Sequence, residues 1–203
     1  MSLSVESRRK VAEFLLRIKA IELNPTAPFT WASGRRCRCA CHPSGRRLAW
    51  STGKACSSRA PIPRPSVRTF TRQLCVEEIE SRFGKIDAIA GVATGGIALG
   101  ALVAQELGLP FIYVRSKAKD HGLGNAIEGD LSVLSNVVVI EDLISTGQSS
   151  LKAVAALREA GVEVKGLLAI FTYGFDVAEA AFAEANCMWS TLTDYSTMLD
   201  QAM

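Results

Sequence analysis

The sequence has no long uninterrupted apolar run. Of its 203 residues, 48% are hydrophobic and 21% are charged, and no apolar stretch approaches the roughly 18 residues that a membrane span needs. The first ten residues are polar and charged, so we expect no secretory signal and a cytoplasmic protein. In that compartment the six cysteines should be reduced thiols. These absences favour a soluble, globular chain, and a length of 203 residues favours one main core with a smaller appendage.

Acidic residues are missing from one long stretch of the chain. Between Leu23 and Val76 there is no Asp or Glu, whereas ten of the 23 basic residues lie there. The rest of the chain contains the other 13 basic residues and all 20 acidic ones, which gives it a net charge of about −7. The positive charge of the chain is therefore local.

Elsewhere the pattern alternates between helices and strands. Val11, Phe14, Leu15 and Ile18 have the spacing of one apolar helical face within residues 6–21. After residue 66, apolar runs without in-and-out alternation separate helical segments, which predicts a parallel sheet buried on both faces by helices, an α/β fold. The predicted strands are 86–93, 110–114, 137–140, 164–171 and, weakly, 188–192; the predicted helices end at 84, 107, 160 and 185. We expect a core over residues 67–203 and an N-terminal helix and hood over residues 1–66.

Ligands of such sheets bind at the carboxyl ends of the strands, here after Ala93, Val114, Ile140 and Phe171. The most informative of these places is the segment 137–150, in which an apolar strand runs into Glu141 and Asp142 and then into a turn rich in hydroxyls and glycine. A helix that starts after this turn offers unpaired N–H groups to a phosphate, while the carboxylates can accept hydrogen bonds from ribose hydroxyls or hold hydrated Mg²⁺. The plainer interpretation is a helix capped by Ser145 or Thr146, which leaves the paired acids unexplained.

A second informative segment is the long polar loop after residue 114. It carries Arg115, Lys117, Lys119 and His121 among glycines. Long loops without structure of their own are often active-site lids, although an ordinary solvated loop is the alternative. A third segment, 91–96, has three glycines after a predicted strand; it is either a phosphate-binding loop or a plain turn with Gly95 or Gly96 at positive φ.

Together these motifs resemble the type I phosphoribosyltransferases. The run Glu141 to Ser149 is similar to their phosphoribosyl pyrophosphate (PRPP) motif, and Lys119-Asp120-His121-Gly122 resembles the mobile loop of the orotate phosphoribosyltransferases. The resemblance implies a type I phosphoribosyltransferase-like core with a small hood. It also implies a pentosyltransferase, or glycosyltransferase, that forms orotidine 5′-monophosphate and pyrophosphate from orotate and PRPP in pyrimidine biosynthesis.

Carried over by position, the resemblance assigns roles to individual residues. Lys119, Asp120 and His121 would be catalytic, with Asp120 or His121 moving a proton, and Ser145 would also contact orotate. One departure is Ser116, where many relatives have lysine; Lys117 is a candidate substitute. The residues implied to bind PRPP are Arg115, Lys119, His121, Glu141, Asp142, Leu143, Ile144, Ser145, Thr146, Gly147, Gln148 and Ser149.

The resemblance also implies cofactors and partners. Mg²⁺ would arrive with PRPP rather than on dedicated protein ligands, and two copies would form a homodimer with shared active sites. We expect no nucleic acid or membrane partner. A purine-type phosphoribosyltransferase and a non-catalytic PRPP-sensing regulator are the alternative functions.

The resemblance fails over residues 35–66, where no period of 2 or 3.6 predicts regular structure. Relatives have a Ser-Pro pair and an Asp-Asn-Arg run there, which this chain lacks. The run Cys37 to His42 could hold a metal, although its spacing is tighter than that of structural zinc sites, and the basic residues could bind nucleic acid. We favour out-of-frame translation of a GC-rich stretch, which predicts poor order and weak orotate turnover.

Overall fold

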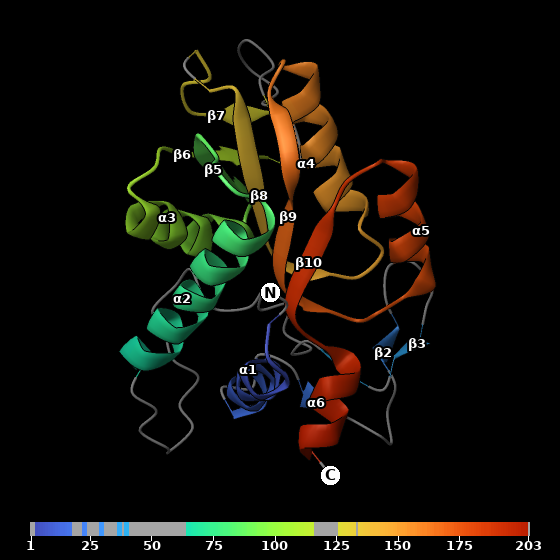
Figure 1. The fold of residues 1–203 in the computed structure, drawn as a ribbon. Coiled ribbons are helices and arrows are strands. Elements are labelled where there is room, and N and C mark those ends of the chain that lie inside the picture. The colour runs from blue at the N-terminus through green and yellow to red at the C-terminus, as the bar shows by residue number, and fades with distance from the viewer. Residues whose placement is uncertain are drawn as a thin grey trace.

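The computed structural model of the chain describes residues 3–17, 22–23, 29–30, 36–37, 39–40, 64–115, 126–132 and 134–202. In Figure 1 a central sheet separates two groups of helices. In chain order the elements are α1 (Val5–Arg17), β1 (Glu22–Leu23), β2 (Phe29–Thr30), β3 (Arg36–Cys37), β4 (Cys39–Ala40), α2 (Arg64–Arg82), β5 (Ala88–Val92), α3 (Gly95–Leu107), β6 (Phe111–Val114), β7 (Ile127–Glu128), β8 (Asn136–Ile144), α4 (Gln148–Glu159), β9 (Glu163–Thr172), α5 (Asp176–Glu184), β10 (Trp189–Asp194) and α6 (Tyr195–Ala202).

The central sheet has six strands in the order β10-β9-β8-β5-β6-β7. All neighbouring strands are parallel except β6 and β7, which pair antiparallel. Because each parallel connection needs a crossover, α3, α4 and α5 return the chain over the faces of the sheet. This arrangement confirms the predicted α/β fold with a mostly parallel sheet.

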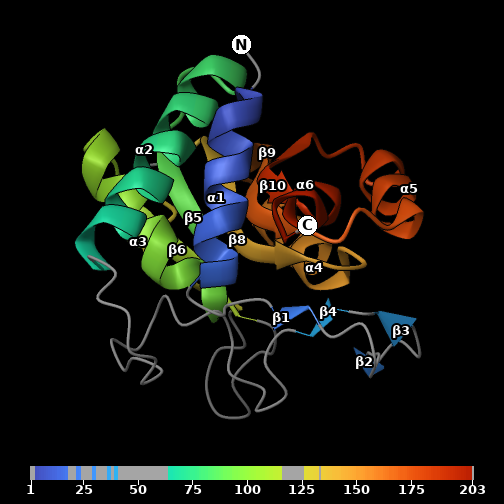
Figure 2. The same cartoon turned by 90° about the horizontal axis from the view of Figure 1, so that it is seen from below.

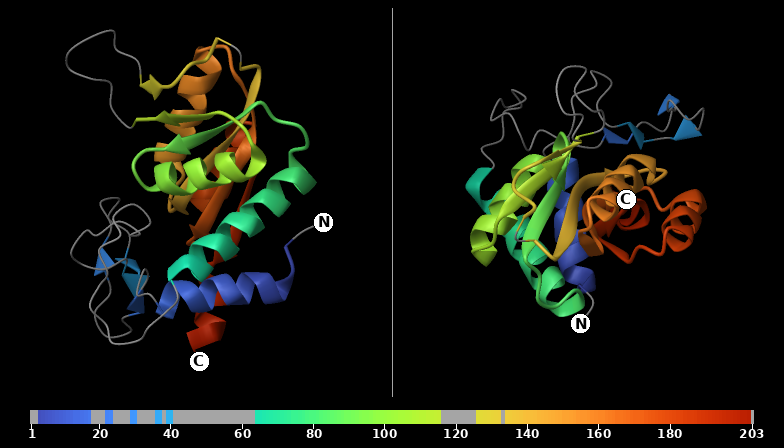
Figure 3. Two further views of the ribbon diagram at one scale, coloured as in Figure 1. Left: turned by 90° about the vertical axis from the view of Figure 1, so that its left-hand side faces the viewer. Right: turned by 90° about the horizontal axis from the view of Figure 1, so that it is seen from above.

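Alternate residues of the strands enter two separate hydrophobic clusters. On β8, Val138 and Ile140 pack with α1, α2 and α3, whereas Val137 and Val139 pack with α4 and α5. The right panel of Figure 3 shows the twisted sheet between these two layers. Both faces are therefore covered, which explains why the strands are apolar without alternation.

At one end of the sheet, α1 and α6 pack against each other and against β10 (Figure 2). Val11 and Leu15 of α1 are buried and Phe14 is partly buried, as the predicted apolar face requires, whereas Ile18 lies outside the described residues. Asp194 caps α6: its Oδ1 accepts hydrogen bonds from Thr197 N–H at 2.8 Å and Ser196 Oγ at 2.7 Å. No described helix has both the length and the apolar character to cross a membrane.

The strands and helices of the core follow the predicted order, with three differences. The predicted strand 137–140 continues to Ile144 as part of β8, so both acids lie within the strand, where Glu141 is in register with Ala169 of β9. The short strand β7 falls in the predicted loop, since pairing with β6 rather than local pattern defines it. Helix α6 was not predicted, because its one buried side chain, Met198, gives no helical period.

The prediction that residues 35–66 lack regular structure is wrong at three places. β3 pairs antiparallel with β2, β4 pairs antiparallel with β1, and α2 already begins at Arg64. Strands of two residues carry no periodic signal and form through their partners. Cys41 and His42 of the candidate metal run lie outside the described residues, and the boundary between hood and core stays a prediction.

Candidate active site

The register of the sheet brings the predicted segments to one edge. Gly91 of β5 is in register with Ile140 of β8 and with Tyr113 of β6. Because these strands are parallel, their carboxyl ends meet there, so Thr94, Arg115 and the end of β8 lie along the same edge. The end of β9 lies there too, since Phe171 is in register with Leu143 of β8 in a parallel pair. All four predicted strand ends that should carry the chemistry therefore converge.

Glu141 is held inside this edge rather than exposed on it. The residue is 5% exposed; its Oε1 accepts a hydrogen bond from Asp142 N–H at 3.0 Å and its Oε2 accepts one from Ser150 Oγ at 3.1 Å. Burial and the neighbouring Asp142 carboxylate raise the pKa of Glu141 well above its ordinary value, while the bond from Ser150 opposes the rise. The two hydrogen bonds thus define the orientation of the carboxylate, while burial makes its ionised form less favourable than in water.

Asp142 lies against the start of α3. A Cβ atom built on Gly95 would overlap the Asp142 carboxylate, and one built on Gly96 would overlap the carbonyl oxygen of Ile140. Neither glycine has a positive φ, so the predicted plain turn with positive φ is wrong. These glycines allow the strand carrying the acids to approach the helix closely.

The turn after β8 keeps its backbone donors available. Gly147 is the N-cap residue of α4 at φ +78°, without a side-chain cap, so the alternative in which Ser145 or Thr146 caps the helix is wrong. Within the described part of the chain, no hydrogen-bond acceptor is found for the N–H groups of Thr146, Gly147, Gln148 and Ser149. Four such donors at a helix start form a ready anion site.

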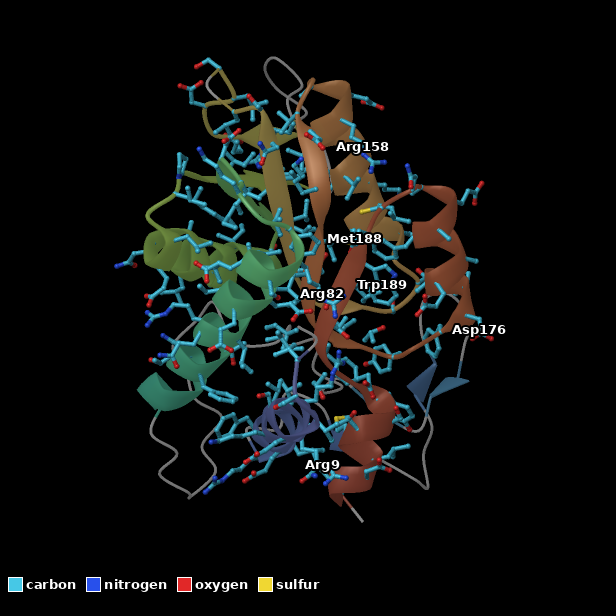
Figure 4. The ribbon with its side chains drawn as sticks, viewed as in Figure 1. Arg9, Arg82, Arg158, Asp176, Met188 and Trp189 are labelled. Carbon is cyan, nitrogen blue, oxygen red and sulfur yellow. The ribbon has the colours of Figure 1, made fainter. Side chains whose placement is uncertain are left out.

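Two stacked aromatic side chains, Phe182 and Trp189, pack against the turn at Gly147. A Cβ atom on Gly147 would lie 2.7 Å from Cε2 of Phe182, a fully buried side chain of α5. Phe182 in turn stacks on Trp189 with ring centroids 4.8 Å apart, and Figure 4 shows Trp189 at the start of β10. The backbone at Gly147 therefore sits directly on a rigid ring.

Arg115 follows β6 at the same edge. Its N–H donates to the Ala126 carbonyl at 2.7 Å, and its Nε lies 3.3 Å from Oε1 of Glu128 in β7. This ion pair is one-third exposed, so it can be exchanged for a ligand phosphate at small cost. Ser116, Lys117, Lys119, Asp120, His121 and Gly122 lie outside the described residues.

Two supporting residues were missed by sequence reasoning. Phe182 had no signal beyond its helical apolar position. Ser150 did have one, because it occupies the first place of a buried face continued by Ala153, Val154 and Leu157, a place where an apolar residue is expected.

The site and fold match known proteins. Residues 71–193 match the phosphoribosyl transferase domain, so the chain belongs to the phosphoribosyl transferases. Within them, the chain is 53% identical over 192 residues to an orotate phosphoribosyltransferase of Phocaeicola vulgatus, a match covering 95% of this chain and 84% of the relative. A second orotate phosphoribosyltransferase, from Listeria innocua, is 48% identical over 195 residues, or 96% of this chain and 86% of that one. The chain belongs to the orotate phosphoribosyltransferase family.

A solved structure agrees with this placement. The crystal structure of orotate phosphoribosyltransferase from Aeropyrum pernix superimposes with a TM-score of 0.75 at 28% identity, covering 95% of this chain and 97% of that one. The resemblance inferred from the motifs, and the type I phosphoribosyltransferase fold that it implied, are thereby confirmed.

Proposed function

We propose that this chain transfers the phosphoribosyl group of PRPP to orotate, forming orotidine 5′-monophosphate and pyrophosphate. The observation that carries the proposal is the juxtaposition of two carboxylates, Glu141 and Asp142, with the unbonded N–H groups of residues 146–149. The carboxylates suit the ribose hydroxyls, and the N–H groups suit the 5-phosphate. The chain is 53% and 48% identical in sequence to two orotate phosphoribosyltransferases, which favours orotate as the acceptor.

The mechanism follows from where charge develops. As the bond from the anomeric carbon to pyrophosphate breaks, the ribosyl group gains positive charge and the leaving oxygens gain negative charge. Carboxylates at positions 141 and 142 stabilise the first charge, and Arg115 with the proposed loop cations Lys119 and His121 stabilise the second. A ring nitrogen of orotate forms the new bond after losing its proton, for which Asp120 or His121 is the proposed acceptor.

We also propose that Mg²⁺ takes part, brought by PRPP. The donor set fits, since the half-buried Asp142 carboxylate is a hard oxygen ligand beside the proposed position of the ribose hydroxyls. Mg²⁺ would neutralise charge on the pyrophosphate. Titration calorimetry with PRPP should give much tighter binding with Mg²⁺ than with a chelator, and equal binding in both would contradict this role.

A homodimer with shared active sites is the proposed assembly, and the cytoplasm is the expected compartment. The support is the resemblance of the Lys119 to Gly122 run to a loop that closes over the neighbouring subunit's site. If sites are shared, mixing inactive Lys119→Ala and Asp142→Asn variants should give hybrid dimers in which one of the two sites is intact. After random exchange of subunits, about a quarter of all sites should then be active. No recovery of activity after subunit exchange would contradict shared sites.

The experiment that tests the proposed function compares acceptor bases. Consumption of orotate, adenine and hypoxanthine is followed with PRPP and Mg²⁺. Turnover of orotate alone is expected; turnover of a purine would favour the purine-type alternative, and PRPP binding without turnover of any base would favour the sensor. Calorimetric titration with PRPP and then orotate separates the two substrates, and binding of the first without the second would point to residues 35–66.

A further inference from the structure

Ser150 is a buried polar residue on the sheet-facing side of α4. It is 1% exposed and opens the buried face that Ala153, Val154 and Leu157 continue. A serine inside a helix commonly bonds back to the carbonyl one turn earlier. Here its hydroxyl instead donates to Oε2 of Glu141 on β8, at 3.1 Å.

This bond completes the fixation of the Glu141 carboxylate. Oε1 is held by Asp142 N–H at 3.0 Å and Oε2 by Ser150, so one donor binds each oxygen. A carboxylate has about four lone-pair sites, and half of them remain for other donors. The two bonds therefore define the rotamer of Glu141 and leave acceptor sites for ligand hydroxyls.

We propose that Ser150 is a positioning residue, which holds the Glu141 carboxylate in the orientation that accepts the ribose hydroxyls of PRPP. The inference rests on the proposed function. Without the hydroxyl, the buried Glu141 carboxylate keeps a single donor, and its side chain can rotate away from the substrate.

Ser150→Ala is the direct test, read as the Kd of PRPP with Mg²⁺ by calorimetry. We expect the Kd to rise about tenfold, the size of one hydrogen bond to a charged group, while the KM of orotate stays unchanged.

The chain provides a matched control at Ser190. Its buried hydroxyl donates at 2.7 Å to Oε1 of Glu78, another buried carboxylate, outside the proposed site. Ser190→Ala should lower the free energy of unfolding as Ser150→Ala does, without changing PRPP affinity. Equal effects of both variants on PRPP affinity would overturn the inference.

A double-mutant cycle separates positioning from general loss of structure. In a Glu141→Gln background, Ser150→Ala should change the Kd of PRPP less than twofold, because the carboxylate through which Ser150 acts is gone; a further tenfold loss would contradict the inference. Ser150→Thr, which keeps the hydroxyl, should restore affinity. Ser150→Cys, with a weak donor of similar size, gives the same readout if the alanine variant does not fold. Lack of PRPP binding by the unmodified protein would overturn both the proposed function and this inference, whereas PRPP binding that is insensitive to the Ser150 variants would overturn this inference alone.

Discussion

At the level of single residues, Gly95 is required because there is no room for a side chain, and not because of its backbone conformation. Its φ is ordinary, yet a Cβ atom would overlap the Asp142 carboxylate. Gly95→Ala should displace that carboxylate and raise the Kd of PRPP about tenfold or more, the loss of a charged hydrogen bond. Titration calorimetry measures this change.

Gly100 provides the matched control in the same helix. A Cβ atom there would lie 2.7 Å from Cε2 of Phe111, within the core and away from the acids. Gly100→Ala should therefore alter the midpoint of thermal unfolding but leave PRPP affinity within about twofold. If both variants bind PRPP equally well, the proposed role of Asp142 is wrong.

Asp194 gives a prediction about stability and pH. Burial alone would raise its pKa, but hydrogen bonds from Thr197 and Ser196, with the charge of Arg8, hold the pKa below its ordinary value. Since the folded pKa is depressed, the ionised cap stabilises the fold fully above the unfolded pKa of about 3.9 and loses this effect as pH falls through the folded pKa. Asp194→Ala should therefore cost roughly 1 kcal/mol at pH 7 and progressively less as the pH falls below about 4.

Urea unfolding at pH 7, 5 and 3 checks this dependence. Asp194→Asn keeps a capping oxygen without a titrating proton, so its effect on the free energy of unfolding at pH 7 should be smaller than that of alanine. A cost of Asp194→Ala that is constant down to pH 3 would show that the charge of the cap is irrelevant.

The residue scale is also where sequence reasoning was weakest. It identified Glu141 and Asp142 as a functional pair, because two acids after an apolar strand are unusual. It could not show that Glu141 is buried and bonded to Ser150, since the two residues are nine positions apart and a strand end, a turn and a helix start lie between them. Such contacts depend on tertiary packing and leave no local period.

At the scale of elements, the start of α4 depends on Gly147 and the ring beneath it. Gly147→Ala should cost about 1–2 kcal/mol for its positive φ, and the new Cβ atom would also press on Phe182. The turn must then shift and move the N–H groups of residues 146–149 away from the 5-phosphate. The Kd of PRPP should therefore rise about tenfold or more. Calorimetry and urea unfolding together measure the two effects.

Gly161, just beyond the other end of α4, is the control for this change. Its φ is +83°, but a Cβ atom there meets nothing within 4 Å. Gly161→Ala should show a comparable loss of stability with unchanged PRPP affinity. Loss of PRPP affinity in both variants would mean that helix stability, rather than the geometry of the turn, limits binding.

The elements themselves were largely predictable. Each predicted strand of the core has its counterpart, because strands buried on both faces leave a continuous apolar run. The end of β8 was placed four residues too early, since Glu141 and Asp142 interrupt that run while pairing with β9 continues to Ile144. Polar residues at a strand end are therefore a sign of function as much as of a boundary.

At the scale of the whole molecule, topology creates the site from distant segments. The order β8-β5-β6 in the sheet brings together residues near 91, 115 and 141. Motif spacing predicted which strand ends carry chemistry, and the parallel fold predicted that they meet. The sequence did not predict which side chains support the turn after β8, because Phe182 of α5 and Trp189 of β10 come from much later in the chain.

The proposed function depends above all on binding of the 5-phosphate of PRPP by the N–H groups after β8. Hydrogen–deuterium exchange of residues 146–149, with and without PRPP and Mg²⁺, measures this directly, with ribose 5-phosphate as the smallest ligand. We predict fast exchange in the free protein and strong protection of these amides with either ligand. If saturating PRPP leaves their exchange unchanged, or if these amides are already protected in the free protein, they do not bind the 5-phosphate.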